Sequence, residues 1–244
     1  MRVSDVHTDE WAIDVRGLTK SYGDNPALRH IDLQVKRGEF LTIFGPNGAG
    51  KTTLLKVLST LVKPSSGSAR VGGFDLNRDS RQVRRQIGVV FHQTLLYDDL
   101  TAHENLSFYG KMYDVPHLSE RIHQLLADVG LEARAHDRVH TFSRGMQQRV
   151  AIARALIHDP AVVLLDEPGT GLDEYANAML ADILASTGHG QRTVLMTTHS
   201  LEQGLALGSR IAILAQGKIA HEGPRQMDIQ SLREIYRECT EARN

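Results

Sequence analysis

Apolar and polar residues alternate in two segments near the start of the chain, residues 12–18 and 29–35. A period of two is typical of strands with one buried face, so the pattern predicts a hairpin of antiparallel strands. Another strand is predicted over residues 39–44, immediately before a glycine-rich loop. Beyond the loop the spacing changes to that of a helix with one apolar face, formed by Leu54, Val57, Leu58 and Leu61.

The middle of the chain, residues 94–139, is predicted to be mostly helical. One stretch in it repeats the helical spacing, with Ile122, Leu125, Leu126 and Val129. The next helix is expected to begin within TFSRGMQQR, residues 141–149. Its apolar side is formed by Met146, Val150, Ala153 and Ile157. Residues 226–244 are predicted to form a short helical tail.

Two apolar runs, AVVLL over residues 161–165 and TVLMTT over residues 193–198, contain no alternation. Such runs are typical of strands that are buried on both faces of a parallel sheet. RIAILAQGKIAHEG is predicted to be a hairpin that turns at Gln216 and Gly217. Parallel strands that alternate with helices indicate an α/β fold, into which the helical block is inserted as a subdomain.

Composition and charge narrow the class of protein. The 244 residues carry a formal charge of −1, which gives no electrostatic reason to expect nucleic acid as a partner. Cys239 is the single cysteine, which excludes an internal disulfide and favours a reducing compartment. The start of the chain is charged where a signal peptide is apolar, and no apolar run reaches the roughly 18 residues of a membrane span. We therefore expect a soluble cytosolic chain, with any membrane span supplied by another protein.

The stretch GPNGAGKT, residues 45–52, matches the phosphate-loop pattern G-x-x-x-x-G-K-[ST] between a predicted strand and a predicted helix. Its glycines let backbone N–H groups surround phosphate oxygens, and the helix N-terminus adds a favourable dipole. Lys51 is expected to reach the β- and γ-phosphates, and the Thr52 hydroxyl to bind Mg²⁺. A merely flexible turn would not explain the flanking elements. The residues expected to bind the nucleoside triphosphate here are Gly45, Pro46, Asn47, Gly48, Ala49, Gly50, Lys51, Thr52 and Thr53.

Polar residues follow three of the predicted core strands. VVLLDEP ends in Asp166, expected to hold Mg²⁺ through water, and Glu167, placed to take a proton from an attacking water. His199 follows the strand TVLMTT and is expected to contact the γ-phosphate or Glu167. Gln93 follows IGVVF and is expected to orient water or contact Mg²⁺. Alone, each would be an ordinary strand end, and the phosphate loop is what favours catalytic roles.

These motifs resemble those of the ATP-binding cassette family of transport ATPases, in the family's order from about residue 13 to residue 223. The resemblance implies one nucleotide-binding domain over residues 1–244, with a P-loop NTPase (RecA-like) core and an N-terminal antiparallel β subdomain. The core would take residues 11–93 and 156–225, and the inserted helical subdomain would take residues 94–155.

The resemblance also assigns roles that the residues alone do not. Tyr22 is expected to stack on adenine, and GLD, residues 171–173, to contact a second cassette. FSRGM, residues 142–146, lies at the family's signature position, usually Leu-Ser-Gly-Gly-Gln, which contacts the γ-phosphate held by the opposite subunit. Ser143 and Gly145 suit that contact, although Ser143 is equally suited to cap its helix.

The signature departs from the family pattern at Phe142, Arg144 and Met146. Arg144 either adds attraction to the nucleotide of the opposite subunit or points to solvent, and the sequence does not decide between these. Gly169 stands where the family usually carries a side chain, which affects how rigidly Glu167 is held.

The implied partners are a second cassette, forming a homodimer or a heterodimer, and transmembrane permease subunits. The chain would then lie peripherally on the cytoplasmic face of the inner (plasma) membrane, without nucleic acid. In the family, a helix of the permease enters a groove that maps here to residues 93–113. Candidate contacts are Leu95, Leu96, Tyr97 and Leu100, although core packing would explain these apolar residues equally well.

The transported cargo is indicated only by local likeness. SRGMQQR, LTAHENLSFYGKMY and THSLEQGLALGSRIAIL resemble single-cassette exporter subunits, above all the ATPase of the heme exporter of cytochrome c maturation. Multidrug, lipid and polysaccharide exporters are the alternative. A soluble cassette ATPase outside transport is disfavoured, because those usually carry two cassettes or a long coiled coil. A nucleotide-regulated binding module without turnover is disfavoured by Glu167 and His199.

Overall fold

The computed structural model describes residues 10–169, 192–225 and 228–241. It contains a four-stranded antiparallel sheet, in which the predicted hairpin is confirmed and both strands are longer than expected. The sheet has the order β2-β1-β4-β5, from β1 (Trp11–Tyr22), β2 (Asn25–Lys36), β4 (Ser66–Val71) and β5 (Phe74–Asp75). The hydrophobic pattern did not predict β4, because only Ala69 and Val71 of its SGSARV sequence are buried.

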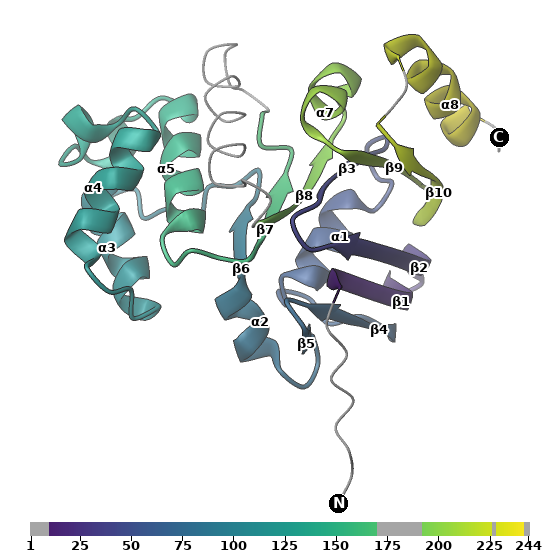
Figure 1. The fold of residues 1–244 in the computed structure, drawn as a ribbon, viewed down its shortest axis with the longest axis horizontal. Helices are drawn as coiled ribbons and strands as arrows, with labels where there is room; N and C mark the ends of the chain where they lie inside the picture. Colours follow the sequence, from purple (N-terminus) through teal and green to yellow (C-terminus); the bar gives the residue numbers. More distant parts are fainter. Residues whose placement is uncertain (1–9, 170–191, 226–227, 242–244) are drawn as a thin grey trace, which may run out of the picture.

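The second sheet contains the predicted parallel strands, in the order β10-β9-β3-β8-β7-β6 (Figure 1). Neighbouring strands are parallel except β9 and β10, which form the predicted hairpin. Their bounds are β3 (Phe40–Phe44), β6 (Ile87–Val90), β7 (Val162–Asp166), β8 (Thr193–Thr198), β9 (Arg210–Ala215) and β10 (Lys218–Pro224). All residues of β7 and β8 are buried, which confirms that both strands are covered on both faces.

The faces of β7 explain its unbroken apolar sequence. Val162 and Leu164 belong to the core cluster between the two sheets, which also contains the leucines and the valine of helix α1 (Lys51–Leu58). Val163 and Leu165 belong to a second cluster with the helical subdomain. Because successive side chains of the strand alternate between these two cores, each position has to be apolar.

Within the described residues, three further helices lie beside the sheets. Helix α2 (Ser80–Gln86) precedes β6 and buries Val83. Helices α7 (Leu201–Leu207) and α8 (Ile229–Glu241) pack with β3 and β9 around Phe44 and Leu232, so the predicted tail is helical where the structure describes it.

Leu61 does not belong to the apolar face of α1, which corrects the sequence-based prediction. The helix ends at Leu58, and Thr60 takes the left-handed conformation with φ of 64°. A left-handed residue cannot continue an α-helix, so Leu61 leaves the helical spacing and is 60% exposed.

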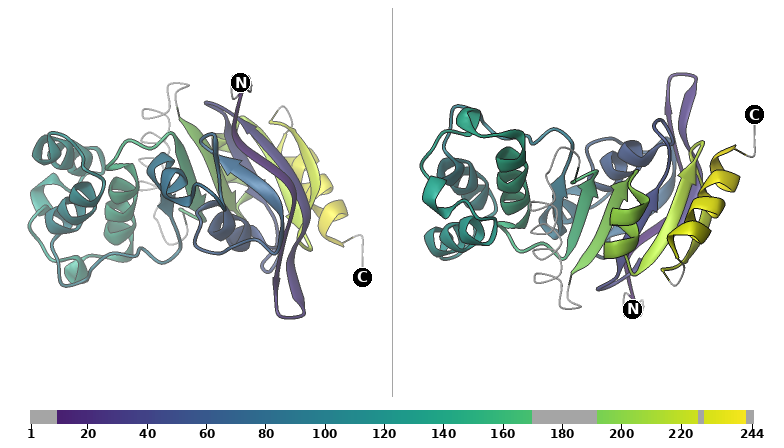
Figure 2. Two further views of the ribbon diagram at one scale, coloured as in Figure 1. Left: turned by 90° about the horizontal axis from the view of Figure 1, so that it is seen from below. Right: turned by 90° about the horizontal axis from the view of Figure 1, so that it is seen from above.

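The helical subdomain extends to one side of both sheets (Figures 1 and 2). It contains α3 (Ala102–Met112), α4 (Leu118–Asp128) and α5 (Arg144–Leu156), with short 3₁₀ turns at Glu132–Arg134 and Val139–Thr141. The predicted apolar face is confirmed, because its four members are buried: Ile122, Leu125, Leu126 and Val129. The division of the chain at residues 94 and 155 stays a prediction. In the part of the chain that the structure describes, no helix combines the length and apolar character needed to cross a bilayer.

Candidate functional site

The phosphate loop is a tightly packed turn between β3 and α1. Two of its glycines have no room for a side chain. A Cβ atom would lie 2.2 Å from the Leu214 carbonyl oxygen at Gly45, and 2.6 Å from the Ala27 carbonyl oxygen at Gly50. Gly50 also has φ of 108°, which is unfavourable for residues other than glycine. It stands at the N-cap of α1 without a side chain to cap it, so the first N–H groups of the helix are left for an anion.

Lys51 lies inside this loop and is 5% exposed. Its Nζ donates to the carbonyl oxygens of Gly45, at 2.6 Å, and Pro46, at 3.2 Å, and lies 3.6 Å from Oε1 of Glu167. These carbonyls and one carboxylate offset the cost of burying the ammonium group. Thr52 is exposed at the helix start, and Thr53 is half-buried.

The ends of β7 and β8 bring Glu167 and His199 together. Oε2 of Glu167 lies 3.1 Å from Nδ1 of His199, so the carboxylate stands between the imidazole and Lys51. Glu167 has φ of 50°, an unfavourable conformation for a residue with a long side chain. Its N–H donates to the Thr197 carbonyl over 3.0 Å, which helps hold this backbone. The structure therefore brings together three of the predicted residues.

Two supporting residues were not predicted. The Thr197 hydroxyl donates to Oδ1 of Asp166 over 2.7 Å and fixes this buried carboxylate. Gln148 is 5% exposed, and its Nε2 donates to the Pro168 carbonyl over 3.3 Å. The available signals were weak: a threonine inside a buried strand and a glutamine on the inner face of the signature helix. Gly169 is half-buried beside the contact of Gln148.

The signature residues begin α5. Ser143 is exposed and caps the helix, since its Oγ accepts from the N–H of Met146 at 3.3 Å. Arg144 is exposed, and within the chain it has a contact that the sequence did not suggest. Its guanidinium donates to the His92 imidazole of the same chain, with Nη2 2.8 Å from Nε2. Gly145 is half-buried, and Phe142 packs into the helical subdomain's core.

Other predicted residues lie outside the group formed by Lys51, Glu167 and His199. Tyr22 ends β1 and is 48% exposed, and Lys20 Nζ lies 5.0 Å from its ring centroid. Gln93 is exposed in the loop after β6. The GLD sequence, residues 171–173, lies outside the described residues.

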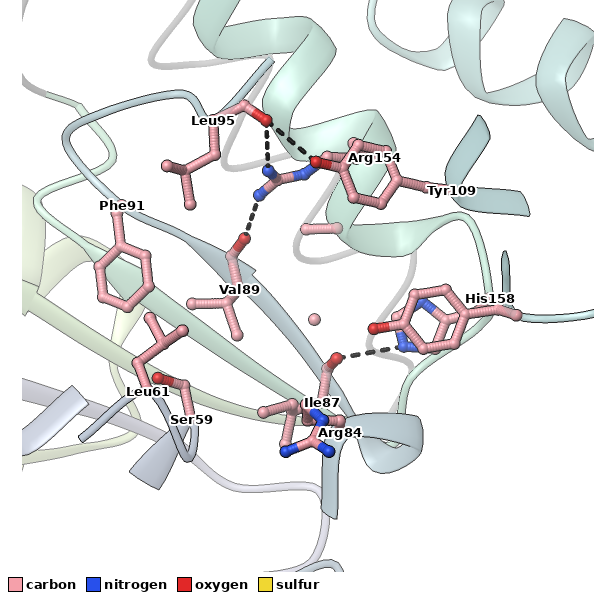
Figure 3. Close-up of a pocket in the computed structure, with 13 residues that line it drawn as sticks. Ser59, Leu61, Arg84, Ile87, Val89, Phe91, Leu95, Tyr109, Arg154 and His158 are labelled. Carbon is pink, nitrogen blue, oxygen red and sulfur yellow. Dashed lines mark hydrogen bonds between the residues drawn. The ribbon is translucent and has the colours of Figure 1, made fainter. Parts of the chain in front are cut away.

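A separate groove of about 220 Å³ lies between β6 and helices α3 and α5 (Figure 3). Its apolar wall is formed by Leu61, Ile87, Val89, Phe91, Leu95, Tyr109 and Tyr113, and its polar residues include Arg84, Arg154 and His158. The described residues contain six large, well-exposed hydrophobic side chains, and five of them line this groove or belong to the adjoining loop and helix α3: Leu61, Leu95, Tyr97, Phe108 and Met112. Such a concentration is typical of a protein-binding surface.

Of the four residues expected to contact a membrane partner, some are exposed near this groove and others are packed into the protein. Leu95 is 50% exposed and Tyr97 is 48% exposed, with the Tyr97 ring 5.2 Å from that of Phe108. Leu96 packs against the core of the helical subdomain, and Leu100 is half-buried. Core packing therefore accounts for Leu96, whereas Leu95 and Tyr97 are accessible.

His158 is an uncharged part of the groove. Its ring stacks on Tyr113 with centroids 3.9 Å apart, and Nε2 lies 3.1 Å from the Ile87 carbonyl oxygen. Burial lowers the pKa of His158 to about 4. In the unfolded chain the pKa is roughly 6.5, so between these values the unfolded state binds a proton that the folded state does not. Falling pH in this window therefore destabilises the fold through His158.

We expect His158→Gln to reduce this acid sensitivity. The variant keeps an N–H donor for Ile87, and it removes the titrating ring. Between pH 7 and pH 4.5, the free energy of unfolding of wild type should fall by roughly 2 kcal/mol more than that of the variant. Urea denaturation at both pH values measures it, with the exposed His140→Gln as control. A constant difference across the two pH values would contradict the proposed protonation state.

Comparison with known proteins adds independent findings. Residues 28–170 match the family model described as ABC transporter. The chain is similar to the ABC transporter ATP-binding protein NatA of Bacillus subtilis (strain 168), with 39% identity over 200 residues, 81% of each chain. It is also similar to the daunorubicin resistance ATP-binding protein DrrA3 of Streptomyces coeruleorubidus, with 40% identity over 217 residues, 87% of this chain and 68% of the relative.

A solved structure supports the same comparison. The ATP-binding cassette MJ0796, in a dimeric post-hydrolysis state bound to ADP and Pi, is 31% identical and superposes with a TM-score of 0.79. The match covers 88% of this chain and all of the other. The predicted fold class, an α/β P-loop core with an antiparallel β subdomain and inserted helices, is confirmed.

Proposed function

Because this chain belongs to the ABC transporter family of ATP-binding proteins, we propose that it is the ATP-hydrolysing subunit of an exporter, working as a dimer with separate membrane subunits. The observation that carries the enzymatic part is the position of Glu167, which contacts Lys51 of the phosphate loop and His199 at the end of β8. A binding module without turnover would have no need for a carboxylate held in a strained backbone conformation at this place.

The binding step uses the loop around Lys51. We propose that the triphosphate lies along residues 45–53, and that Lys51 exchanges its carbonyl partners for β- and γ-phosphate oxygens. The free N–H groups at the start of α1 add donors to the same phosphates. Tyr22, exposed at the end of β1, is proposed to stack on the adenine.

Mg²⁺ fits the oxygen donors at this place. The Thr52 hydroxyl and the Gln93 amide are exposed, and the Asp166 carboxylate is fixed by Thr197. Oxygen ligands from few protein groups, completed by water and phosphate, are what Mg²⁺ prefers. When bound, the ion would neutralise charge on the phosphates.

The hydrolytic step is assigned to Glu167, which accepts a proton from the attacking water through its carboxylate. His199 holds one oxygen of this carboxylate, and in the closed dimer it is proposed to reach the γ-phosphate. The partner's copy of Ser143 and Gly145 would supply the opposite side of the phosphate, and the dimeric state of MJ0796 supports this part of the proposal. Removal of the γ-phosphate then removes the contact between subunits, which provides a two-state switch.

The membrane partner is proposed to dock in the groove of Figure 3, which would place the chain at the cytoplasmic face of the membrane. An amphipathic helix suits a groove with apolar walls and exposed hydrophobic side chains around it. The similarity to a daunorubicin resistance protein favours a drug-like cargo among the exporter alternatives. The relatives give no support to a heme cargo, which rested on local likeness alone.

An export experiment tests the proposal in the native host. Deleting the gene that encodes the chain is expected to raise the amount of daunorubicin retained by the cells severalfold, while their cytochrome c content stays constant. Wild type and the control Arg237→Glu, on the exposed side of α8, should restore efflux, whereas Met112→Glu should not, because a charge would enter the exposed apolar surface. A fall in cytochrome c with normal drug retention would instead indicate heme. Restoration by Met112→Glu would contradict the proposed docking surface.

A further inference from the structure

Arg154, near the end of α5, is buried and holds the segment that carries Gln93. It is 9% exposed. Its Nη2 donates to the Val89 carbonyl over 2.7 Å, and Nη1 donates to that of Leu95 over 3.2 Å (Figure 3). Nη1 also donates to the Thr94 carbonyl over 3.1 Å. Since Val89 precedes Gln93 and the other two follow it, one guanidinium fixes both ends of the loop.

The contacts of Arg154 depend on the conformation of the segment around Gln93. The Arg154 guanidinium donates to three backbone carbonyls. The Tyr109 ring lies 5.2 Å from its guanidinium carbon, and the Tyr109 hydroxyl is a further polar neighbour. A buried cation held in this way depends on the loop keeping its conformation, because each carbonyl offsets part of the cost of removing the charge from water. The Tyr109 hydroxyl also donates to the Leu95 carbonyl over 3.1 Å, so that oxygen has two donors.

The other end of α5 touches the same segment. Arg144 donates to His92, the residue before Gln93, while Ser143 caps the helix beside it. The helix that carries the signature residues therefore contacts the segment at residues 89, 92, 94 and 95, on both sides of Gln93.

We propose that Arg154 is a positioning residue that fixes Gln93 to the signature helix, with Arg144 as a second attachment. The proposal rests on the ATPase function proposed above. It makes Gln93 and Ser143 parts of one unit, so that movement of the helical subdomain changes the position of both. Leu95 and Tyr109 also line the groove, so a partner bound there acts on a carbonyl that Arg154 holds.

The test compares Arg154→Lys with a matched control on α4. Lysine keeps the charge of Arg154 but cannot reach three carbonyls as a planar fork can. We expect kcat for ATP hydrolysis to fall about tenfold to 100-fold through misplacement of Gln93, while KM for ATP stays within about twofold because the phosphate loop is untouched. Amide hydrogen exchange of residues 91–97 should become about tenfold faster or more. The control is Arg121→Lys, whose guanidinium donates to the Leu156 carbonyl over 2.7 Å and lies 3.4 Å from that of Ile157, away from this segment.

The control is expected to leave kcat, KM and this exchange unchanged. Equal losses in both variants would overturn the proposal in favour of a general effect on α5, and so would unchanged exchange in Arg154→Lys. If Arg154→Lys does not fold, Arg144→Gly and His92→Phe carry the test: each should lower kcat, and the double variant should be no worse than either. Additive losses, or a raised KM in Arg144→Gly alone, would overturn the second attachment. A wild-type chain without ATPase activity would refute the proposed function, while hydrogen exchange of residues 91–97 would still test whether Arg154 fixes this segment.

Discussion

Lys51→Ala is expected to weaken ATP binding by at least about 100-fold, because two charge-assisted contacts to phosphate oxygens would be lost at roughly 1.5–3 kcal/mol each. The burial of Lys51 inside the loop supports this size of effect, since the ammonium group already lies where the phosphates are proposed to bind. A fluorescent ATP analogue titrated into the purified chain measures the dissociation constant.

The control for this measurement is Lys56→Ala, in the last turn of the same helix and outside the loop. It removes the same charge and should leave the dissociation constant within about threefold, because Lys56 lies outside the phosphate loop. The circular dichroism spectra of both variants should match that of wild type, because alanine favours the helix. An unchanged dissociation constant in folded Lys51→Ala would refute the assignment of the phosphate loop.

The sequence was sufficient to predict the buried strands and the polar residues that follow them. Continuous apolar runs identified β7 and β8, and the chain direction placed their polar ends at one edge of the sheet. That edge is where Glu167 and His199 meet. The mutual contact follows from topology, because the carboxyl ends of adjacent parallel strands must lie side by side.

Other features depended on contacts that periodicity does not encode. The end of α1 is fixed by a left-handed residue, Thr60, so Leu61 continued the helical spacing in the sequence but not in space. Arg144 offered two interpretations in isolation, and its actual partner, His92, is 52 residues away. Long-range pairs of polar side chains such as this one have no local signal, which is also why Arg154 was not singled out.

Glu167→Gln is expected to lower kcat for ATP hydrolysis about 100-fold or more while ATP still binds, since a positioned general base contributes about 10²–10⁴-fold. Glutamine has the size of glutamate and retains a hydrogen-bonding oxygen, but it cannot accept the proton of the attacking water. ATP would therefore persist between two subunits, and the variant should elute as a dimer in size exclusion with ATP and as a monomer without it.

Two further variants separate the role of Glu167 from that of its neighbours. Glu202→Gln removes an exposed carboxylate that pairs with Arg233 on α8, and it should hydrolyse ATP at the wild-type rate. His199→Ala removes the imidazole 3.1 Å from Glu167 and should slow hydrolysis as well, but it leaves the carboxylate able to act as base. If Glu167→Gln hydrolysed ATP at nearly the wild-type rate while His199→Ala was inactive, His199 would take over as the base. A large loss in Glu167→Gln together with an ATP-dependent dimer requires instead that the carboxylate performs the proton transfer, since the strained backbone, the loop and the imidazole are all retained in that variant.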